Sequence, residues 1–140
     1  MFDDVLWLKA FERGPVRVVC SSRARDGLAG LSVEFYGRSS RNRWDEAVRF
    51  DGYPGDVHVH WFPPDGRSMA ESLDDTASVE EVVKVVWQGL EDKLPALMAS
   101  SGFPDTLSDV AARTYVVRAI EHEFFRELVE PAQDSASSGV

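Results

Sequence analysis

The densest run of residues with useful chemistry is Asp-Val-His-Val-His, from Asp56 to His60. Residues two apart on a β-strand point to the same face, so His58 and His60 are expected to project together. Histidine can exchange a proton near neutral pH, and it is also a common metal ligand. Three interpretations stay open: a solvated strand face, a metal-free acid–base site, and a metal site completed by Asp45 or Asp56.

Polar residues on the preceding segments are expected to join the two histidines. Asp45 and Arg49 fall on the more polar side of the alternating segment 44–50, and Glu34 falls on the polar side of the segment before it. Arginine can hold a developing negative charge, so this combination suits phosphodiester cleavage without a metal. The expected catalytic group is His58, His60, Asp45 and Arg49.

Arginines in the loop before segment 44–50 predict a rim that binds substrate. Arg41 and Arg43 lead directly into that segment, and arginine pairs with phosphate through two parallel hydrogen bonds. A solvated loop is the alternative. The expected substrate-binding residues are Arg43, Arg41 and Glu34, and the expected ligands, if a metal binds instead, are His58, His60 and Asp56. The sequence has no glycine-rich nucleotide motif, P-loop, Gly-x-Ser-x-Gly or His-Glu-x-x-His, so we expect no cofactor.

Short alternating segments in the first half of the chain predict the strands that would position these residues. Breakers such as Gly37, Asp51-Gly52 and the Pro63-Pro64-Asp65-Gly66 turn separate the segments. Connections this short join antiparallel neighbours. We therefore predict an antiparallel meander of four to five strands over about residues 5–62. The predicted strands are 15–20, 31–36, 44–50 and 56–62, with 5–11 as a fifth strand in preference to a short helix.

Helical spacing of apolar residues dominates the second half. Ser78 and Glu81 form a capping box at the start of a helix predicted over about 79–99, and Pro95 should kink or end it. A second helix is predicted over about 107–129, and both should pack on the apolar face of the sheet. Residues 131–140 are small and polar, so we expect a disordered tail after a single α+β domain at 1–130.

The alternation also predicts which side chains enter the core. Trp44, Phe50 and Trp61 share the apolar side of their segments, whereas Phe62 falls on the histidine side and is expected beside that pair. Cys20 is the single cysteine and lies among apolar residues, which favours a buried, inert thiol and excludes an intrachain disulfide framework.

The net charge of −9 over 140 residues is divided unevenly. Residues 1–67 carry ten basic and ten acidic residues, whereas residues 68–140 carry five and fourteen. The molecule as a whole is therefore unsuited to nucleic acid, but RNA stays possible on the arginine-rich sheet half. The acidic half could dock on a basic protein surface. No run of about 18 apolar residues is present, so we expect no membrane contact and a cytoplasmic location.

The segment Arg43-Trp44-Asp45, followed by Pro54, His58 and His60, resembles the centre of the TumE-like family of small bacterial toxin–antitoxin toxins. The resemblance covers roughly residues 30–90. Glu46 stands where the family tends to have Asn, and Asp56 or Val57 stands where it tends to have its first His; residues 104–140 lie outside the resemblance. It implies a toxin-like protein with an antitoxin partner, and it adds weight to Arg43, Asp45, His58 and His60 as a site.

These observations predict a small bacterial or phage protein that is a toxin-like component acting on RNA or nucleotides. Two alternatives stay open: a non-catalytic acidic interaction protein, such as an immunity protein, inhibitor or anti-defence decoy, and a metal-binding module. Catalysis itself is left undecided. We expect a protein partner, either an antitoxin or a target, and a homodimer is a further option.

Overall fold

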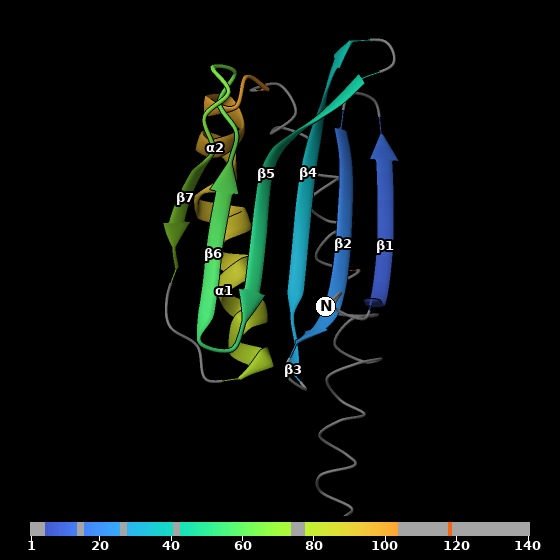
Figure 1. The fold of residues 1–140 in the computed structure, drawn as a ribbon, viewed down its shortest axis with the longest axis vertical. Helices are drawn as coiled ribbons and strands as arrows, with labels where there is room; N and C mark the ends of the chain where they lie inside the picture. The colour runs from blue at the N-terminus through green and yellow to red at the C-terminus, as the bar shows by residue number, and fades with distance from the viewer. Residues whose placement is uncertain are drawn as a thin grey trace, which may run out of the picture.

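The computed structural model describes residues 5–13, 16–25, 28–40, 43–73, 78–103 and 118. An antiparallel sheet comes first and two helices follow, which confirms the predicted α+β class (Figure 1). The strands are β1 (Val5–Arg13), β2 (Val16–Arg25), β3 (Leu28–Ala29), β4 (Leu31–Ser40), β5 (Arg43–Tyr53), β6 (Asp56–Trp61) and β7 (Met69–Ser72).

The strands follow one another across the sheet in the order β1-β2-β4-β5-β6-β7, and the short β3 pairs with β2. Every pairing is antiparallel, as the short connections predict. Segment 5–11 is a strand, so that expectation is confirmed. The strands β3 and β7 were not predicted, because two and four residues carry too little alternation to read.

The two helices of the described chain both come from the first predicted helix. Helix α1 (Val79–Asp92) begins after Ser78, whose hydroxyl accepts the backbone N–H of Glu81 at 3.2 Å. Helix α2 (Leu94–Ser100) carries Pro95 in its first turn, where a missing N–H costs nothing, so the predicted break at Pro95 is confirmed. The predicted second helix at 107–129 lies outside the described residues except for Arg118, which is helical, and the predicted tail lies outside them entirely.

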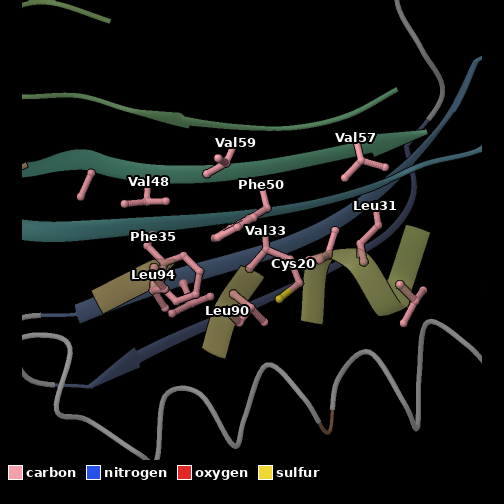
Figure 2. Packing of buried hydrophobic residues seen from close by; sticks show 14 of the residues in the cluster. Cys20, Leu31, Val33, Phe35, Val48, Phe50, Val57, Val59, Leu90 and Leu94 are labelled. Atoms are coloured by element: carbon pink, nitrogen blue, oxygen red, sulfur yellow. The ribbon is translucent and has the colours of Figure 1, made fainter. Parts of the chain in front are cut away.

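Helices α1 and α2 cover one face of β5 and β6 (Figure 1). Gly89 of α1 lies close against the sheet, because a Cβ there would lie 2.6 Å from Cε1 of Phe50. The core fills the space between the layers and includes the buried thiol of Cys20, as predicted (Figure 2). Its fully buried side chains include Val18, Val33, Val48, Phe50, Val59, Val82, Val86 and Leu90. The opposite face of the sheet, called the open face below, carries the polar side chains of the same strands.

A β-bulge in β5 decides which residues reach the open face. Glu46 pairs with Tyr36 and Val48 pairs with Phe35, so Ala47 is an extra residue with no partner on β4. Ala47 and Val48 are consequently both fully buried. The carbonyl of Ala47 instead accepts hydrogen bonds from the backbone N–H of Phe62 (3.1 Å) and from Oγ of Ser101 (2.8 Å).

The bulge overturns two predictions about residues before it. Asp45 pairs with Gly37, where a Cβ would run into the ring of Phe103 after α2, so Asp45 lies on the helix side of the sheet and not beside the histidines. Trp44 lies on the open face instead of in the core, with the guanidinium of Arg17 4.6 Å from its ring centre. Both predictions assumed an unbroken two-residue alternation across β5.

None of the helices in the described segments has the length and apolar character needed to cross a membrane.

Candidate functional site

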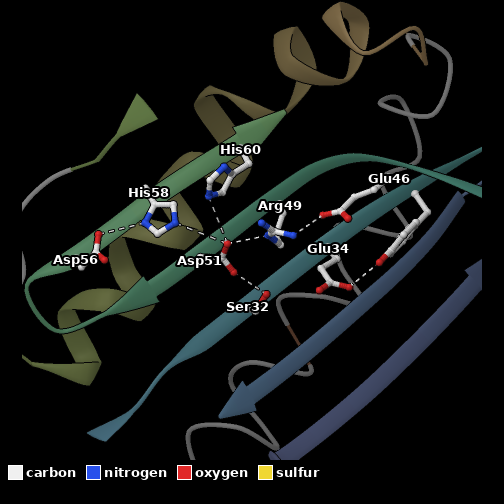
Figure 3. Close-up of polar contacts among 9 residues, drawn as sticks. Ser32, Glu34, Glu46, Arg49, Asp51, Asp56, His58 and His60 are labelled. Carbon is white, nitrogen blue, oxygen red and sulfur yellow. Dashed lines mark hydrogen bonds and ion pairs between the residues drawn. The ribbon is translucent and has the colours of Figure 1, made fainter. Parts of the chain in front are cut away.

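Strand pairing sets the polar residues of the open face in rows. One row runs Ser21, Ser32, Asp51 and His58 across β2, β4, β5 and β6. The next row runs Glu34, Arg49 and His60. Directly paired residues share a face and have neighbouring Cβ atoms, so the sheet itself brings these side chains together. Figure 3 shows Ser32, Arg49, His58 and His60 converging on Asp51.

Asp51 is the centre of this arrangement. Its Oδ1 accepts a hydrogen bond from Oγ of Ser32 at 2.9 Å, and its Oδ2 accepts one from Nε of Arg49 at 2.7 Å. The same Oδ2 lies 3.7 Å from Nε2 of His58 and 3.8 Å from Nε2 of His60 (Figure 3). The carboxylate is thus fixed by two donors and faces two imidazole nitrogens that lie too far away for a direct hydrogen bond.

The two histidines are held edge to face. Their ring centres are 4.6 Å apart, with an angle of 84° between the ring planes. Nδ1 of His58 lies 3.1 Å from Oδ1 of Asp56, which directs its Nε2 toward Asp51. Burial lowers the pKa of His60, and the neighbouring His58 and Arg49 lower it further against the opposing effect of Asp51. His60 therefore favours its neutral form, which is the form that accepts a proton or binds a metal.

Asp51, His58 and His60 have the donor set and spacing of a metal site. Each offers one ligand atom, and the three atoms lie within 4.8 Å of one another. Tetrahedral ligands with bonds near 2.1 Å would be about 3.4 Å apart. The two separations between Asp51 and the histidines, 3.7 and 3.8 Å, are close to that value, and the two histidine nitrogens lie within 4.8 Å of each other, so inward rotation of the side chains would close the site on an ion.

Arg49 connects this group to a second pair of carboxylates. Its Nη1 lies 3.2 Å from Oε1 of Glu46, and burial raises the pKa of Glu46 against the lowering effect of Arg49. The hydroxyl of Tyr36 donates to Oε2 of Glu34 at 2.8 Å, and burial together with this bond raises the pKa of Tyr36. Arg49 is therefore bonded to the carboxylates of Asp51 and Glu46, and its main role is to hold these side chains in place.

The converging residues line one side of a pocket of about 380 Å³ on the open face. Its wall continues across β5 and β4 to β2. Besides the residues already described, the pocket is lined by Arg23, Gly30, Leu31 and Tyr53. Concave, partly enclosed sites with a few convergent polar groups are the usual location of ligand binding.

The structure brings together five of the residues predicted for the site and separates the others. His58, His60, Arg49, Glu34 and Asp56 all line the open-face pocket. Arg43 and Asp45 form an ion pair of 2.9 Å and line a different hollow with Phe62 and Phe103. The ring of Phe62 also lies against the open face, because its centre is 5.9 Å from the guanidinium carbon of Arg49, which pairs with His60. Arg41 lies outside the described residues.

Sequence reasoning missed Asp51 and Ser32, which complete the centre of the pocket. Asp51 was assigned to a turn with Gly52, because Asp-Gly is a strong turn signal. Strand β5 instead runs on to Tyr53, and the turn follows at Pro54-Gly55, where Gly55 has a φ of 87°. Arg49 and Asp51 are two residues apart, so a strand extended beyond Phe50 would have placed Asp51 on the same side as Arg49 and the histidines.

A family model described as a domain of unknown function, DUF7700, matches residues 10–123. This span includes every residue that lines the open-face pocket. Neither the curated proteins nor the solved structures gave a significant match to the chain.

Proposed function

Because the chain belongs to the DUF7700 family, whose description names no activity, we propose a function from the open-face pocket: it binds a divalent transition-metal ion through Asp51, His58 and His60 and uses it to hydrolyse a phosphate ester. The observation that carries the proposal is the position of Oδ2 of Asp51 between two Nε2 atoms at 3.7 and 3.8 Å. Two histidines and one carboxylate are a frequent ligand set for zinc and iron, and they leave positions open for water and substrate.

The same geometry disfavours a metal-free mechanism in which the histidines act as base and acid. In-line phosphoryl transfer needs the attacking and leaving oxygens on opposite sides of the phosphorus. His58 and His60 have ring centres 4.6 Å apart in edge contact, so no phosphoryl group fits between them. They act from one side of a substrate, which is the arrangement of ligands and not of an acid–base pair.

The surrounding residues hold the proposed ligands in place. Ser32 and Arg49 fix the carboxylate of Asp51, and Asp56 sets the ring orientation of His58. Partners of this kind keep a ligand in its binding orientation and raise metal affinity. A bound ion would supply a water of lowered pKa and a positive charge for a phosphate oxygen. The pocket then needs no further nucleophile from the chain.

The proposed substrates are phosphate esters of the class expected from the sequence, RNA or nucleotides. Phosphate esters suit a site that places a divalent cation beside arginine. A toxin-like role with an antitoxin partner, and a cytoplasmic location, remain predictions from the sequence and its resemblance. Growth arrest on expression, lost in the His58→Ala/His60→Ala double variant, is the expected result for that role.

Calorimetric titration with Zn²⁺, Mn²⁺ and Co²⁺, on protein purified without an affinity tag, tests the proposed metal site. We expect one ion per chain, and at least a hundredfold weaker binding in His58→Ala and in His60→Ala, because each removes one of three ligands. The control is Asp65→Asn, whose carboxylate is exposed and bonded to Arg67. Equal affinity in wild type and both histidine variants would refute the site.

A further inference from the structure

The open-face pocket has a second cationic end that the proposed metal site does not use. Arg23 of β2 lines the pocket and is exposed. Within the described residues, the Arg23 side chain forms no ion pair or hydrogen bond, whereas Arg49 is committed to Asp51 and Glu46. Of the two arginines that the structure describes in the pocket wall, Arg23 is therefore the one whose guanidinium is available to a ligand.

Gly30 and Tyr53 line the pocket between its two ends. The backbone N–H of Gly30 donates to the carbonyl of Arg23 at 3.0 Å, so these residues are neighbours across the β2–β4 turn. A Cβ at Gly30 would lie 2.4 Å from Cε1 of Tyr53, so glycine lets the Tyr53 ring lie against the backbone. Tyr53 precedes the turn into β6 and lines the same pocket, so an aromatic ring lies between Arg23 and the histidine strand.

Strand spacing sets the length of ligand that can reach both ends. Strand β2 is separated from β6 by β4 and β5, which is three steps of about 4.8 Å, or about 14 Å between backbones. The arginine and histidine side chains shorten this span from both sides. A pocket volume of about 380 Å³ is near the lower end of the range for small-molecule sites. A single phosphate is too short to bridge the ends, and a folded RNA is too large to enter.

We propose that the substrate is a nucleotide-sized molecule with two anionic groups, one held at the Asp51, His58 and His60 metal site and the other held by the guanidinium of Arg23. This inference rests on the proposed function for its first anchor. The second anchor makes Arg23 a specificity-determining residue, because arginine binds phosphate or carboxylate through two parallel hydrogen bonds. Tyr53 offers its ring to the part of the molecule between the two groups.

Adenosine 3′,5′-bisphosphate and adenosine 3′-monophosphate are suitable probes, because they differ by one phosphate. Binding of each is measured by calorimetry with and without Mn²⁺. Wild type should prefer the bisphosphate, and Arg23→Gln should lose about tenfold of bisphosphate affinity while its monophosphate affinity and its Mn²⁺ affinity stay unchanged. Arg23→Lys should recover part of the loss. The matched control is Arg17→Gln, which removes the same charge from the same strand but from outside the pocket.

The outcomes separate this inference from the proposed function. No preference for the bisphosphate, or an equal preference in Arg23→Gln, overturns the second anchor even if Mn²⁺ binds. An Arg23-dependent preference that persists without any metal binding supports the second anchor and refutes the metal site. Tighter binding of an unphosphorylated eight-nucleotide RNA than of the bisphosphate, unaffected by Arg23→Gln, overturns the small-substrate inference.

Discussion

The two sides of β5 hold similar residue types and differ in what those residues can do. On the open face, Asp51 is fixed by Ser32 and Arg49 and faces two imidazole nitrogens inside a pocket. On the helix side, Asp45 forms a pair with Arg43, whose side chain is 72% exposed. The first group has converging polar side chains with room between them, whereas the second is a surface ion pair of the kind that contributes little energy.

The difference shows that neighbours, not residue type, make a site. Asp45 and Asp51 are six residues apart on the same strand, so an unbroken alternation would place them on the same side. They can lie on different sides only if one extra residue interrupts the alternation between them. The unpaired Ala47 is that residue. Its carbonyl is held by Phe62 and Ser101, which anchors the bulge to β6 and to the end of α2. The helix layer therefore fixes which carboxylate faces the histidines.

The largest effect is expected from removing the charge of each carboxylate in turn. Asp51→Asn keeps the shape of the side chain but loses an anionic ligand, so Zn²⁺ affinity should fall at least a hundredfold. Asp45→Asn, the matched change on the other face, should leave that affinity unchanged. Titration calorimetry on both variants measures the difference. If Asp45→Asn weakens binding as much as Asp51→Asn does, the comparison between the two faces is wrong.

A smaller effect is expected from replacing two serines, one bonded to Asp51 on the open face and one bonded to the bulge from the helix side. Ser32→Ala removes the hydrogen bond to Oδ1 of Asp51, so metal affinity should fall about tenfold with little change in stability. Ser101→Ala removes a bond to the carbonyl of Ala47, so the free energy of unfolding should fall by about 1 kcal/mol with metal affinity unchanged. Urea unfolding and metal titration of both variants check this. The reverse pattern would show that the bulge, and not the carboxylate, controls the pocket.

The layout of the sheet could be read from the sequence, because alternation and turn residues act locally. The histidine pair and the run from Ser78 into α1 follow directly from such patterns. The position of Asp45 could not be read, since the bulge is stabilised by partners on β6 and α2 that are distant in sequence. The sequence did contain one signal of the bulge. Glu46 is a charged residue on the side of segment 44–50 that is otherwise apolar, and it is followed by two consecutive apolar residues, Ala47 and Val48. Asp51 was hidden by the turn signal of Asp51-Gly52.

The smallest effect concerns the pH dependence of stability, which arises on the open face through His60. Burial, His58 and Arg49 lower the pKa of His60 in the folded protein, with Asp51 opposing them. The unfolded chain therefore binds more protons below the ordinary histidine value near 6.5. Stability should be complete above that pH and should fall as the pH drops through 6.5 toward the lowered pKa. The burial that raises the pKa of Glu46 has the opposite sign and acts at more acidic pH.

Urea unfolding at pH 7.5 and 6.0, in the presence of a chelator, isolates this contribution in wild type and His60→Gln. Wild type should lose stability between the two values, by less than the change expected for Ser101→Ala, and His60→Gln should lose less than wild type. Asp45→Asn should follow wild type, because the carboxylate it removes lies on the other face. An equal loss in wild type and His60→Gln would mean that the open face leaves the protonation of His60 unperturbed. The neutral histidine that the metal site requires would then have to be imposed by the metal ion itself.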